Sequence, residues 1–458
     1  MDAKEKQVIL TAGLGYGDEG KGTMVDYLTR LYGAGLVVRY NGGAQAGHNV
    51  VDSFGRCHTF SQFGSGTLVS GTKTHLSESM IVNPLSMMRE HEHLVEIGMD
   101  DALQRLTIDE RALVTTPFQI AQNRLLEIQR GANRYGSCGL GIGQTIDDFK
   151  NYGSQVLSVG DLVRRSVLRK KLWFIREEKL AAIEPMVKNL GHTEAVEREL
   201  SWFGTEVFEF LVNLFSDFGR QISLVDESYL ANQLSLNQTV IFEGAQGILL
   251  DNIYGFWPHV TKTDITFNQA YRLLAKAGYQ GVVSRLGILR AYATRHGAGP
   301  LVTEDIELGK KLVDTHNKTN DWQESFRVGW FDLLAVKYAL AAIGGVDSIA
   351  MTNLDRIDGL DSIKVCIAYE YQGGSPEELE SYFESTQDNA GRLLITGIKV
   401  LAQPSHEYQG KLAGLLAACR PVYIIIRKQD YLKFIKEKFG VPVSIVSYGP
   451  MAKDKVYI

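Results

Sequence analysis

A glycine-rich loop near the start of the chain carries side chains that could act on a nucleotide. It reads GYGDEGKG from Gly15 to Gly22 and contains Asp18, Glu19 and Lys21. Such loops bind phosphate, because their backbone N–H groups and the following helix N-terminus favour an anion. The phosphate-loop signature has Ser or Thr after the lysine to hold Mg²⁺, whereas Gly22 follows Lys21 here. The two carboxylates would repel phosphate, so they indicate a metal bridge or proton chemistry; a plain glycine turn is the alternative.

The residues around this loop predict a strand before it and a helix after it. Val8–Leu10 is a short apolar run with two β-branched members, which is typical of a buried strand. Apolar residues then recur at helical spacing from Met24 to Leu31. Strand, glycine loop and helix together are the usual phosphate-binding arrangement of α/β proteins.

Four further glycine clusters interrupt the chain: Asn41–Asn49, Gly136–Gly143, Phe242–Gly247 and Arg295–Pro300. Three of them follow strand-like or apolar segments. Ligands of open parallel sheets bind in the loops beyond the carboxyl ends of the strands, where glycine lets the backbone approach closely. We therefore expect one large site, with separate structural turns as the alternative.

Strand-like and helix-like runs alternate, which predicts an α/β fold with a central, mostly parallel sheet flanked by helices. The strand-like runs are Leu36–Tyr40, Ala112–Thr115, Thr239–Phe242, Ser348–Thr352, Val365–Tyr369, Val422–Arg427 and Val443–Val446. Helices are predicted at Phe118–Gln129 and Asp332–Ala342. The strand-poor span Asp161–Phe218 predicts a helical insertion within a single domain of residues 1–458, since no Pro- or Ser-rich linker marks a boundary.

Composition narrows the class of protein. The 458 residues carry a net charge of −5 with a pI near 6.1, which leaves no electrostatic footprint for nucleic acid or an anionic membrane. No apolar run approaches the ~18 residues of a spanning helix, and the charged start MDAKEKQ leads us to expect no signal peptide. The four cysteines form no CxxC pair, so we expect reduced thiols, no zinc site and a cytoplasmic protein.

Seven motifs, in the same order, resemble adenylosuccinate synthetase over almost the whole chain. They are GYGDEGKG (Gly15–Gly22), NGGAQAGH (Asn41–His48), FEGAQGILLD (Phe242–Asp251), WPHVT (Trp257–Thr261), LGILRAYATRHGAGP (Leu286–Pro300), TNLDRIDG (Thr352–Gly359) and SYGP (Ser447–Pro450). Enzymes of that family join L-aspartate to C6 of a purine nucleotide, usually IMP, using GTP and Mg²⁺. The purine 6-oxygen is phosphorylated first, and aspartate then displaces the phosphate. The resemblance also implies a homodimer.

The resemblance implies roles for the residues of the opening loops. Asp18 would be the general base that removes the N1 proton of the purine, and it would also ligate Mg²⁺ together with the Gly47 carbonyl. His48 would be the general acid to the 6-oxygen and would steady the transferring phosphoryl group; a structural histidine is the alternative. Lys21 would neutralise phosphate as a point charge. Most of the rate in such a transfer comes from positioning and charge neutralisation.

Three groups of binding residues follow from the same matching. The donor nucleotide, GTP or possibly ATP in its place, would contact Gly17, Glu19, Gly20, Gly22, Asn353, Asp355, Ser447 and Gly449. The substrate purine nucleotide would contact Gln45, Ser137, Cys138, Gln246 and Thr261. The substrate aspartate would contact Thr319, Asn320, Gln323 and Arg327. Asp355 would accept hydrogen bonds from N1–H and the 2-amino group of guanine, a bidentate geometry.

Several positions depart from the family pattern. The region His316–Trp330 keeps only Arg327 of an arginine-rich loop that usually clamps aspartate. Ser137 and Cys138 replace a pair of threonines, Leu140 replaces an arginine, and Asn353 stands where lysine is common. The family's arginine that reaches across the dimer has no clear counterpart, with Lys150 the nearest candidate.

These departures leave alternatives open. A phage branch of the family acts on dGMP or GMP to give 2-amino products, and guanine has the same N1–H and 6-oxygen. Some of its members carry Ser in place of the loop Asp, so the retained Asp18 favours IMP as substrate, or else an early-branching relative of the phage enzymes. A phosphate-loop kinase or ATPase using Lys21 is a second alternative. A non-catalytic nucleotide-binding regulator is the third, although loss of Asp18 or His48 would be its expected sign.

Overall fold

The computed structural model describes residues 6–313, 322, 325–373 and 376–458, and they form two compact units. The first unit comprises the described residues within 1–9, 25–245 and 268–283. The second comprises those within 10–24, 246–267 and 284–458. The division falls inside strand β1 (Gln7–Gly13) and helix α1 (Lys21–Tyr32).

The first unit contains a parallel sheet in the strand order β10, β2, β5, β7, β9. Its strands are β10 (Thr239–Gly247), β2 (Leu36–Arg39), β5 (Lys73–Leu76), β7 (Leu106–Asp109) and β9 (Ser223–Val225). β2 is buried along its whole length, as expected for a parallel strand covered on both faces. Because β10 and β2 are parallel, with Glu243 opposite Arg39, the loops after them leave the same edge of this sheet.

Helices and short strands complete the first unit. The helices are α2 (Pro84–Glu96), α3 (Pro117–Arg130), α4 (Ile142–Tyr152), α5 (Arg165–Leu190), α6 (Glu194–Leu200), α7 (Thr205–Gln221), α8 (Ser228–Leu236) and α9 (Asn268–Lys276). The short strands are β3 (His48–Val51) and β4 (Cys57–Phe60), which pair antiparallel, and β6 (Ile81–Val82) and β8 (Leu113–Val114), which pair parallel.

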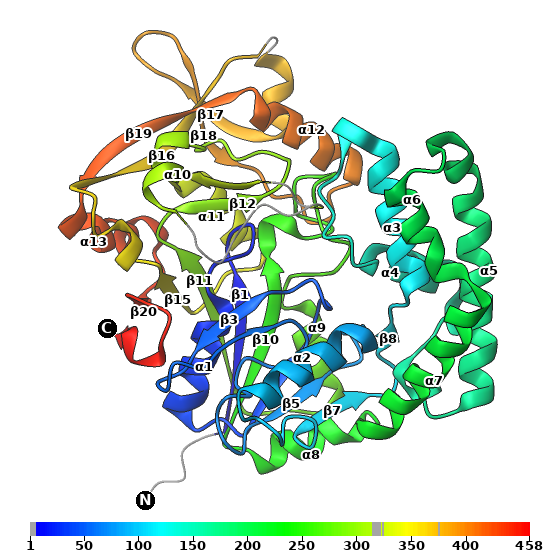
Figure 1. The fold of residues 1–458 in the computed structure, drawn as a ribbon. Coiled ribbons are helices and arrows are strands. Elements are labelled where there is room, and N and C mark those ends of the chain that lie inside the picture. Colours follow the sequence, from blue (N-terminus) through cyan, green and yellow to red (C-terminus); the bar gives the residue numbers. More distant parts are fainter. Residues whose placement is uncertain (1–5, 314–321, 323–324, 374–375) are drawn as a thin grey trace, which may run out of the picture. The chain divides into compact units, whose positions relative to one another are not determined.

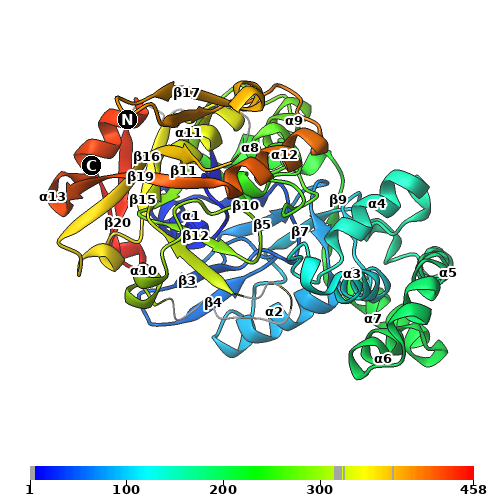
Figure 2. The same ribbon diagram turned by 90° about the horizontal axis from the view of Figure 1, so that it is seen from above.

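The sequence explains why several of these helices begin and pack as they do. The Asn83 side chain caps α2, and a capping box of Thr116 and Gln119 opens α3. α7 buries an apolar stripe at i, i+3 and i+7, namely Phe208, Leu211 and Phe215. Helices α3, α5, α6 and α7 lie side by side in Figures 1 and 2. The span 161–218 therefore consists of helices and connecting turns, without a strand.

The second unit contains a sheet in the order β21, β20, β15, β11, parallel except for its β21 edge. These strands are β21 (Lys455–Tyr457), β20 (Val443–Ser447), β15 (Ser348–Thr352) and β11 (Val282–Arg290). β12 (Ala293–His296) and β13 (Phe326–Gly329) form an antiparallel pair. The unit's helices are α10 (Ile306–Lys311), α11 (Leu333–Ala342), α12 (His406–Ala417) and α13 (Lys428–Phe439).

A separate five-stranded sheet in the second unit corrects one sequence expectation. It contains β14 (Phe331–Asp332), β16 (Ser362–Tyr371), β17 (Phe383–Gln387), β18 (Leu393–Ile398) and β19 (Cys419–Arg427), seen at the top of Figure 1. The predicted strands Val365–Tyr369 and Val422–Arg427 lie here, and they pair antiparallel with each other. Apolar runs alone do not reveal the direction of pairing, so the sequence could not separate these strands from the parallel sheet.

The predicted α/β class with a mostly parallel sheet and flanking helices is otherwise confirmed. Strand Ser348–Thr352 appears with the expected bounds, and the helices at 118–129 and 332–342 appear as α3 and α11. β5 and β7 were not predicted, because KTHL and LTID lack a continuous apolar run. Across the residues that the structure describes, none of the helices is long and apolar enough to span a membrane.

Candidate active site

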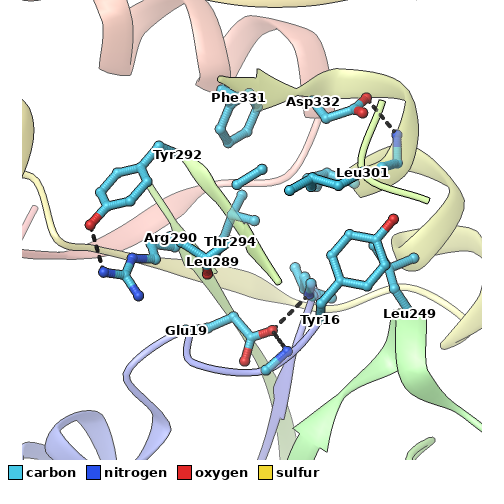
Figure 3. A pocket seen from close by; sticks show the side chains of 16 residues that line it. Tyr16, Glu19, Leu249, Leu289, Arg290, Tyr292, Thr294, Leu301, Phe331 and Asp332 are labelled. Carbon is cyan, nitrogen blue, oxygen red and sulfur yellow. Dashed lines mark hydrogen bonds between the residues drawn. The ribbon is translucent and has the colours of Figure 1, made fainter. Parts of the chain in front are cut away.

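Glu19 explains how the opening loop tolerates one of its two acids. Its Oε1 accepts hydrogen bonds from the backbone N–H groups of Gly15 at 3.0 Å and Gly17 at 2.8 Å. Its Oε2 lies 2.6 Å from the Lys21 ammonium, and both side chains are buried. A Cβ at Gly13 would lie 2.3 Å from this carboxylate, so glycine is needed there. Glu19 is thus an internal anion that the loop N–H groups and Lys21 already neutralise. Figure 3 shows the Glu19 carboxylate with its hydrogen bonds to the loop.

Asp18 is held differently and keeps its carboxylate outside this network. Its φ of +58° is a left-handed conformation that non-glycine residues rarely adopt. The Arg290 guanidinium donates to its backbone carbonyl at 3.1 Å, and Oδ2 lies 3.3 Å from His296 Nε2. Burial alone would raise the pKa of Asp18, but His296, Arg290 and Lys21 together hold it below its usual value. The carboxylate is therefore ionised at neutral pH, the state that both a base and a metal ligand require.

Other contacts fix the loop backbone around these acids. Thr352, the last residue of β15, donates its hydroxyl to the Glu19 carbonyl at 2.6 Å. The N–H of Leu14 donates to Ile288 of β11, and that of Leu249 donates to Gly15. Neighbouring segments of the second unit therefore hold the loop at several points.

In the first unit, His48 opens β3 and pairs with a buried glutamate. His48 Nδ1 lies 2.5 Å from Glu243 Oε1, and Glu243 also accepts from the backbone N–H and the hydroxyl of Ser65. Burial would raise the pKa of Glu243, but the charge of Arg39, followed by His48 and Ser65, holds it below its usual value. An ionised partner at Nδ1 fixes the imidazole tautomer and leaves Nε2 for a ligand.

Glu243 is a residue that sequence reasoning missed. It lies in β10, a strand that is otherwise apolar as far as Phe242. A lone acid within a buried strand was the available signal, because an unpaired buried carboxylate is unfavourable and implies a partner. Finding His48 as that partner required the pairing of β10 with β2, which the sequence does not show.

Gln45 and Gly47 lie in the loop that joins β2 to β3. The Gln45 amide is buried, and neither its oxygen nor its nitrogen has a hydrogen-bond partner among the described residues. Buried polar groups are normally satisfied, so an unpartnered amide is a candidate ligand contact.

The loop with Ser137 and Cys138 is tied to helix α3 in the first unit. The Ser137 hydroxyl donates to Asn123 at 2.8 Å, and the Gly136 and Ser137 N–H groups point to the Glu127 carboxylate. Burial raises the pKa of the Cys138 thiol to about 11, so the thiol is neutral at pH 7. Cys138 can offer a weak S–H donor but no thiolate.

In the second unit, the predicted substrate residues Gln246 and Thr261 are linked through Thr263. Thr263 donates to the Gln246 side-chain oxygen at 3.5 Å, and its hydroxyl lies 3.0 Å from that of Thr261. Gln246 also has a positive φ, of +54°. Two residues that are 15 positions apart in sequence therefore share one short hydrogen-bond chain.

The predicted donor-nucleotide residues at the end of the chain also come together. Asn353, with φ of +58°, follows β15, and Asp355 begins a 3₁₀ turn two residues later. The Leu354 N–H donates to the Ser447 carbonyl at 3.1 Å, and the Ser447 hydroxyl donates to the Gly449 carbonyl at 3.0 Å. Burial raises the pKa of Asp355. The segment Asn353–Asp355 therefore lies beside the Ser447–Gly449 turn.

The predicted aspartate residues are only partly placed. Thr319, Asn320 and Gln323 lie outside the described residues. The Arg327 guanidinium donates to the carbonyls of Gly297 at 2.9 Å and Gly299 at 2.7 Å, and it pairs with Glu304 at 2.8 Å. Arg327 therefore already supports the 297–299 loop.

The described residues offer few ligands for a metal ion. Among the described residues, no group of three or more His, Cys, Asp or Glu side chains is arranged to hold a metal ion. Mg²⁺ in nucleotide sites needs only one or two carboxylates beside phosphate oxygens and water, so the single ionised Asp18 fits it.

Figure 3 shows a mainly apolar pocket beside Tyr16, Leu249, Leu301 and Phe331. Among the predicted site residues that the structure describes, Gly17 and Glu19 are the ones that line this pocket.

A family model and individual relatives of the chain give the same family. The family model described as adenylosuccinate synthetase matches residues 10–456. The chain is 31% identical over 451 residues to the adenylosuccinate synthetase of Chlorobium chlorochromatii, covering 97% of this chain and 96% of that one. It is 32% identical over 456 residues to that of a Marinomonas species, covering 98% of each.

Two solved structures share the fold. The fully ligated adenylosuccinate synthetase of Plasmodium falciparum has a TM-score of 0.77 at 21% identity, covering 98% of this chain and 99% of that one. The cyanophage S-2L succinoaminodeoxyadenylate synthetase, bound to dGMP and to dATP as an energy donor, has a TM-score of 0.58 at 16% identity. That match covers 99% of this chain and 95% of the phage chain.

Proposed function

The chain belongs to the adenylosuccinate synthetase family, and from that premise we propose that it joins L-aspartate to C6 of IMP, with hydrolysis of GTP, to give adenylosuccinate. Membership makes it a nucleotide-dependent ligase that forms C–N bonds. The proposed chemistry is supported by one observation above all. Asp18 is ionised and turned away from the loop's internal ion pair, while Glu19 and Lys21 neutralise each other.

In this proposal Asp18 removes the purine N1 proton. The N1–H bond breaks, an O–H bond forms on the carboxylate, and the electron pair moves onto the 6-oxygen. That oxygen attacks the γ-phosphorus and the nucleoside diphosphate leaves. The aspartate amine then attacks C6, the C6–O bond breaks with its electron pair leaving on the phosphate, and the leaving phosphate takes up the proton that the amine loses. His48 donates through Nε2 to the 6-oxygen, with Glu243 stabilising the imidazolium. To neutralise the phosphates, Lys21 would exchange its contact with Glu19 for a phosphate oxygen.

Asp18 and the Gly47 carbonyl would hold Mg²⁺ in this proposal. The ion would supply charge neutralisation for the phosphoryl transfer. Asp18 is suited to the task because its pKa is lowered and its carboxylate is outside the Glu19–Lys21 pair.

The donor base would be held by Asn353, Asp355, Ser447 and Gly449. A carboxylate acceptor matches the N1–H and 2-amino donors of guanine, which supports GTP. Adenine offers no such pair of donors, so ATP would have to bind without this bidentate contact to Asp355.

We propose that the substrate nucleotide contacts Gln45, Ser137, Cys138, Gln246 and Thr261. The unpartnered Gln45 amide and the Gln246–Thr263–Thr261 chain support this set. Aspartate recognition by Thr319, Asn320, Gln323 and Arg327 stays a prediction. Since Arg327 already serves three acceptors, it would have to exchange at least one of them for a substrate carboxylate.

A second candidate keeps the chemistry and changes the purine to dGMP or GMP, with ATP as donor. Asn353 in place of the usual lysine, and Ser137 and Cys138 in place of threonines, favour it. The phage structure shows that a chain of similar fold binds dGMP and dATP.

One assay on the purified chain separates these candidates. IMP, dGMP and GMP are each paired with GTP or ATP, with Mg²⁺ and L-aspartate present, and both succino-purine absorbance and phosphate are followed. Product from IMP with GTP is expected. Product from dGMP alone would replace the first candidate by the second, and phosphate release without aspartate would indicate a kinase or ATPase. Absence of product from every pairing would reject the ligase assignment to these substrates.

The family also leads us to propose a cytoplasmic homodimer organised as one domain. Light scattering on the eluting protein measures the mass directly, and a 50.9 kDa monomer at micromolar concentration would contradict the dimer.

A further inference from the structure

His296 faces the carboxylate on which the proposed reaction depends. It ends β12, and its Nε2 lies 3.3 Å from Oδ2 of Asp18. Both side chains are largely buried, with exposed fractions of 17% and 23%. The ring of Phe326, its partner across the β12–β13 pair, lies 4.9 Å from the imidazole and limits its movement.

The Asp18 carboxylate needs a neighbouring hydrogen-bond donor to fix its orientation. The terminal torsion of aspartate has a broad, two-fold energy profile, so rotamer preference alone does not fix the direction of its oxygens. Arg290 donates to the backbone carbonyl of Asp18 at 3.1 Å and to the Tyr292 hydroxyl at 2.5 Å, and neither of these two bonds orients the Asp18 carboxylate. The N–H groups of Gly15 and Gly17 and the Lys21 ammonium donate to the Glu19 carboxylate. Because these donors are used by Glu19, another residue has to orient the Asp18 carboxylate.

We propose that His296 is a positioning residue for Asp18, an inference that rests on the function proposed above. With its proton on Nε2, the imidazole donates to Oδ2 and fixes the plane of the carboxylate. Oδ1 then remains for the purine N1–H. When that bond breaks the proton passes to Oδ1, the electron pair stays on the purine, and the His296 proton stays on Nε2. His296 touches the base and not the reacting atoms, so it acts through Asp18.

Three variants test the role. His296→Val removes the N–H donor, and His296→Gln retains one on a side chain of similar reach. His192→Val is the matched control, because His192 pairs with Glu197 at the protein surface. We expect His296→Val to lower kcat on the order of 10- to 100-fold, the effect of a misplaced catalytic group, with KM for both nucleotides changed less than about 3-fold. His296→Gln should recover most of kcat, and His192→Val should match the wild type.

The outcomes separate this inference from the proposed function. A wild-type chain without ligase activity rejects the function itself. If the wild type is active and His296→Val retains its kcat, the function stands and the positioning role is wrong. The role is also wrong if His296→Gln is as slow as His296→Val, or if His296→Val raises KM without lowering kcat. A thermal unfolding curve for each variant identifies loss of folding, and His296→Ala, which also lacks the N–H donor, replaces His296→Val with the same expected fall in kcat if the valine variant is unfolded.

Discussion

Replacing Glu243 by glutamine should slow turnover while leaving nucleotide binding in place. Glu243 accepts from His48 Nδ1 at 2.5 Å and from the Ser65 N–H at 2.9 Å, inside a buried environment. Glutamine keeps one acceptor oxygen and replaces the other by an NH₂ group. If the oxygen stays with Ser65, the NH₂ group faces His48 Nδ1, which then cannot carry a proton, and the imidazolium needed by the proposed general acid is disfavoured.

The size of the effect follows from the bond that is lost. A hydrogen bond to a charged group contributes ~1.5–3 kcal/mol. If that difference is expressed in the transition state, kcat falls roughly 10- to 150-fold. KM for the donor nucleotide should stay near its wild-type value, since His48 is proposed to act on the transferring group.

Glu90 provides the matched control for this experiment. It is buried in the same unit, and its carboxylate accepts from the backbone N–H groups of Ser61, Gln62 and Phe63 at 3.0, 2.9 and 3.1 Å. Glu90→Gln should destabilise the fold to a similar degree without a comparable fall in kcat. The reasoning about His48 is refuted if Glu243→Gln retains kcat within about 2-fold, or if Glu90→Gln slows turnover equally.

Three further predictions concern the second unit. Asp18→Ala should lower kcat by at least ~100-fold, the contribution of a general base, with nucleotide affinity largely intact in a binding titration; undiminished turnover would exclude the role of base. Glu19→Gln should lower the free energy of unfolding by about 3–5 kcal/mol in urea denaturation, because it leaves the buried Lys21 charge unpaired; an unchanged midpoint would contradict that reading. Burial raises the pKa of Asp332 from 3.8 to about 6, so the folded chain binds more protons than the unfolded chain between these values. Its stability should therefore fall by roughly 3 kcal/mol as pH rises through this range, and Asp332→Asn should flatten that part of the curve; an identical curve for the variant would disprove it.

The parts of the site that could be predicted from sequence are those encoded locally. A strand, a glycine loop and a helix follow one another within residues 7–32, and each carries its own pattern. The same holds for Asn353 and Asp355, which follow a five-residue strand with an apolar centre, Ser348–Thr352. The resemblance to the family could also be recognised from the sequence, because seven motifs occur in the family's order.

The parts that could not be predicted depend on pairing between distant segments. Glu243 meets His48 because the parallel register of β10 and β2 brings residues about 200 positions apart to one edge. Glu19 looked like an acid that would repel phosphate, and only the direction of its side chain shows that the loop neutralises it. The three bonds of Arg327 to Gly297, Gly299 and Glu304 likewise have no local signal.

Backbone strain adds an independent reason to place the chemistry in the loops of the second unit. The non-glycine residues with positive φ in the described part of the chain are Asp18, Gln246 and Asn353. Each such conformation costs of order 1–3 kcal/mol and persists where the surrounding structure fixes it. All three lie at or beyond the carboxyl ends of β1, β10 and β15, and all three side chains were predicted to contact a nucleotide. Glycine would adopt these angles without strain but would remove the carboxylate or amide. The retention of polar side chains there is consistent with strain maintained for ligand contact.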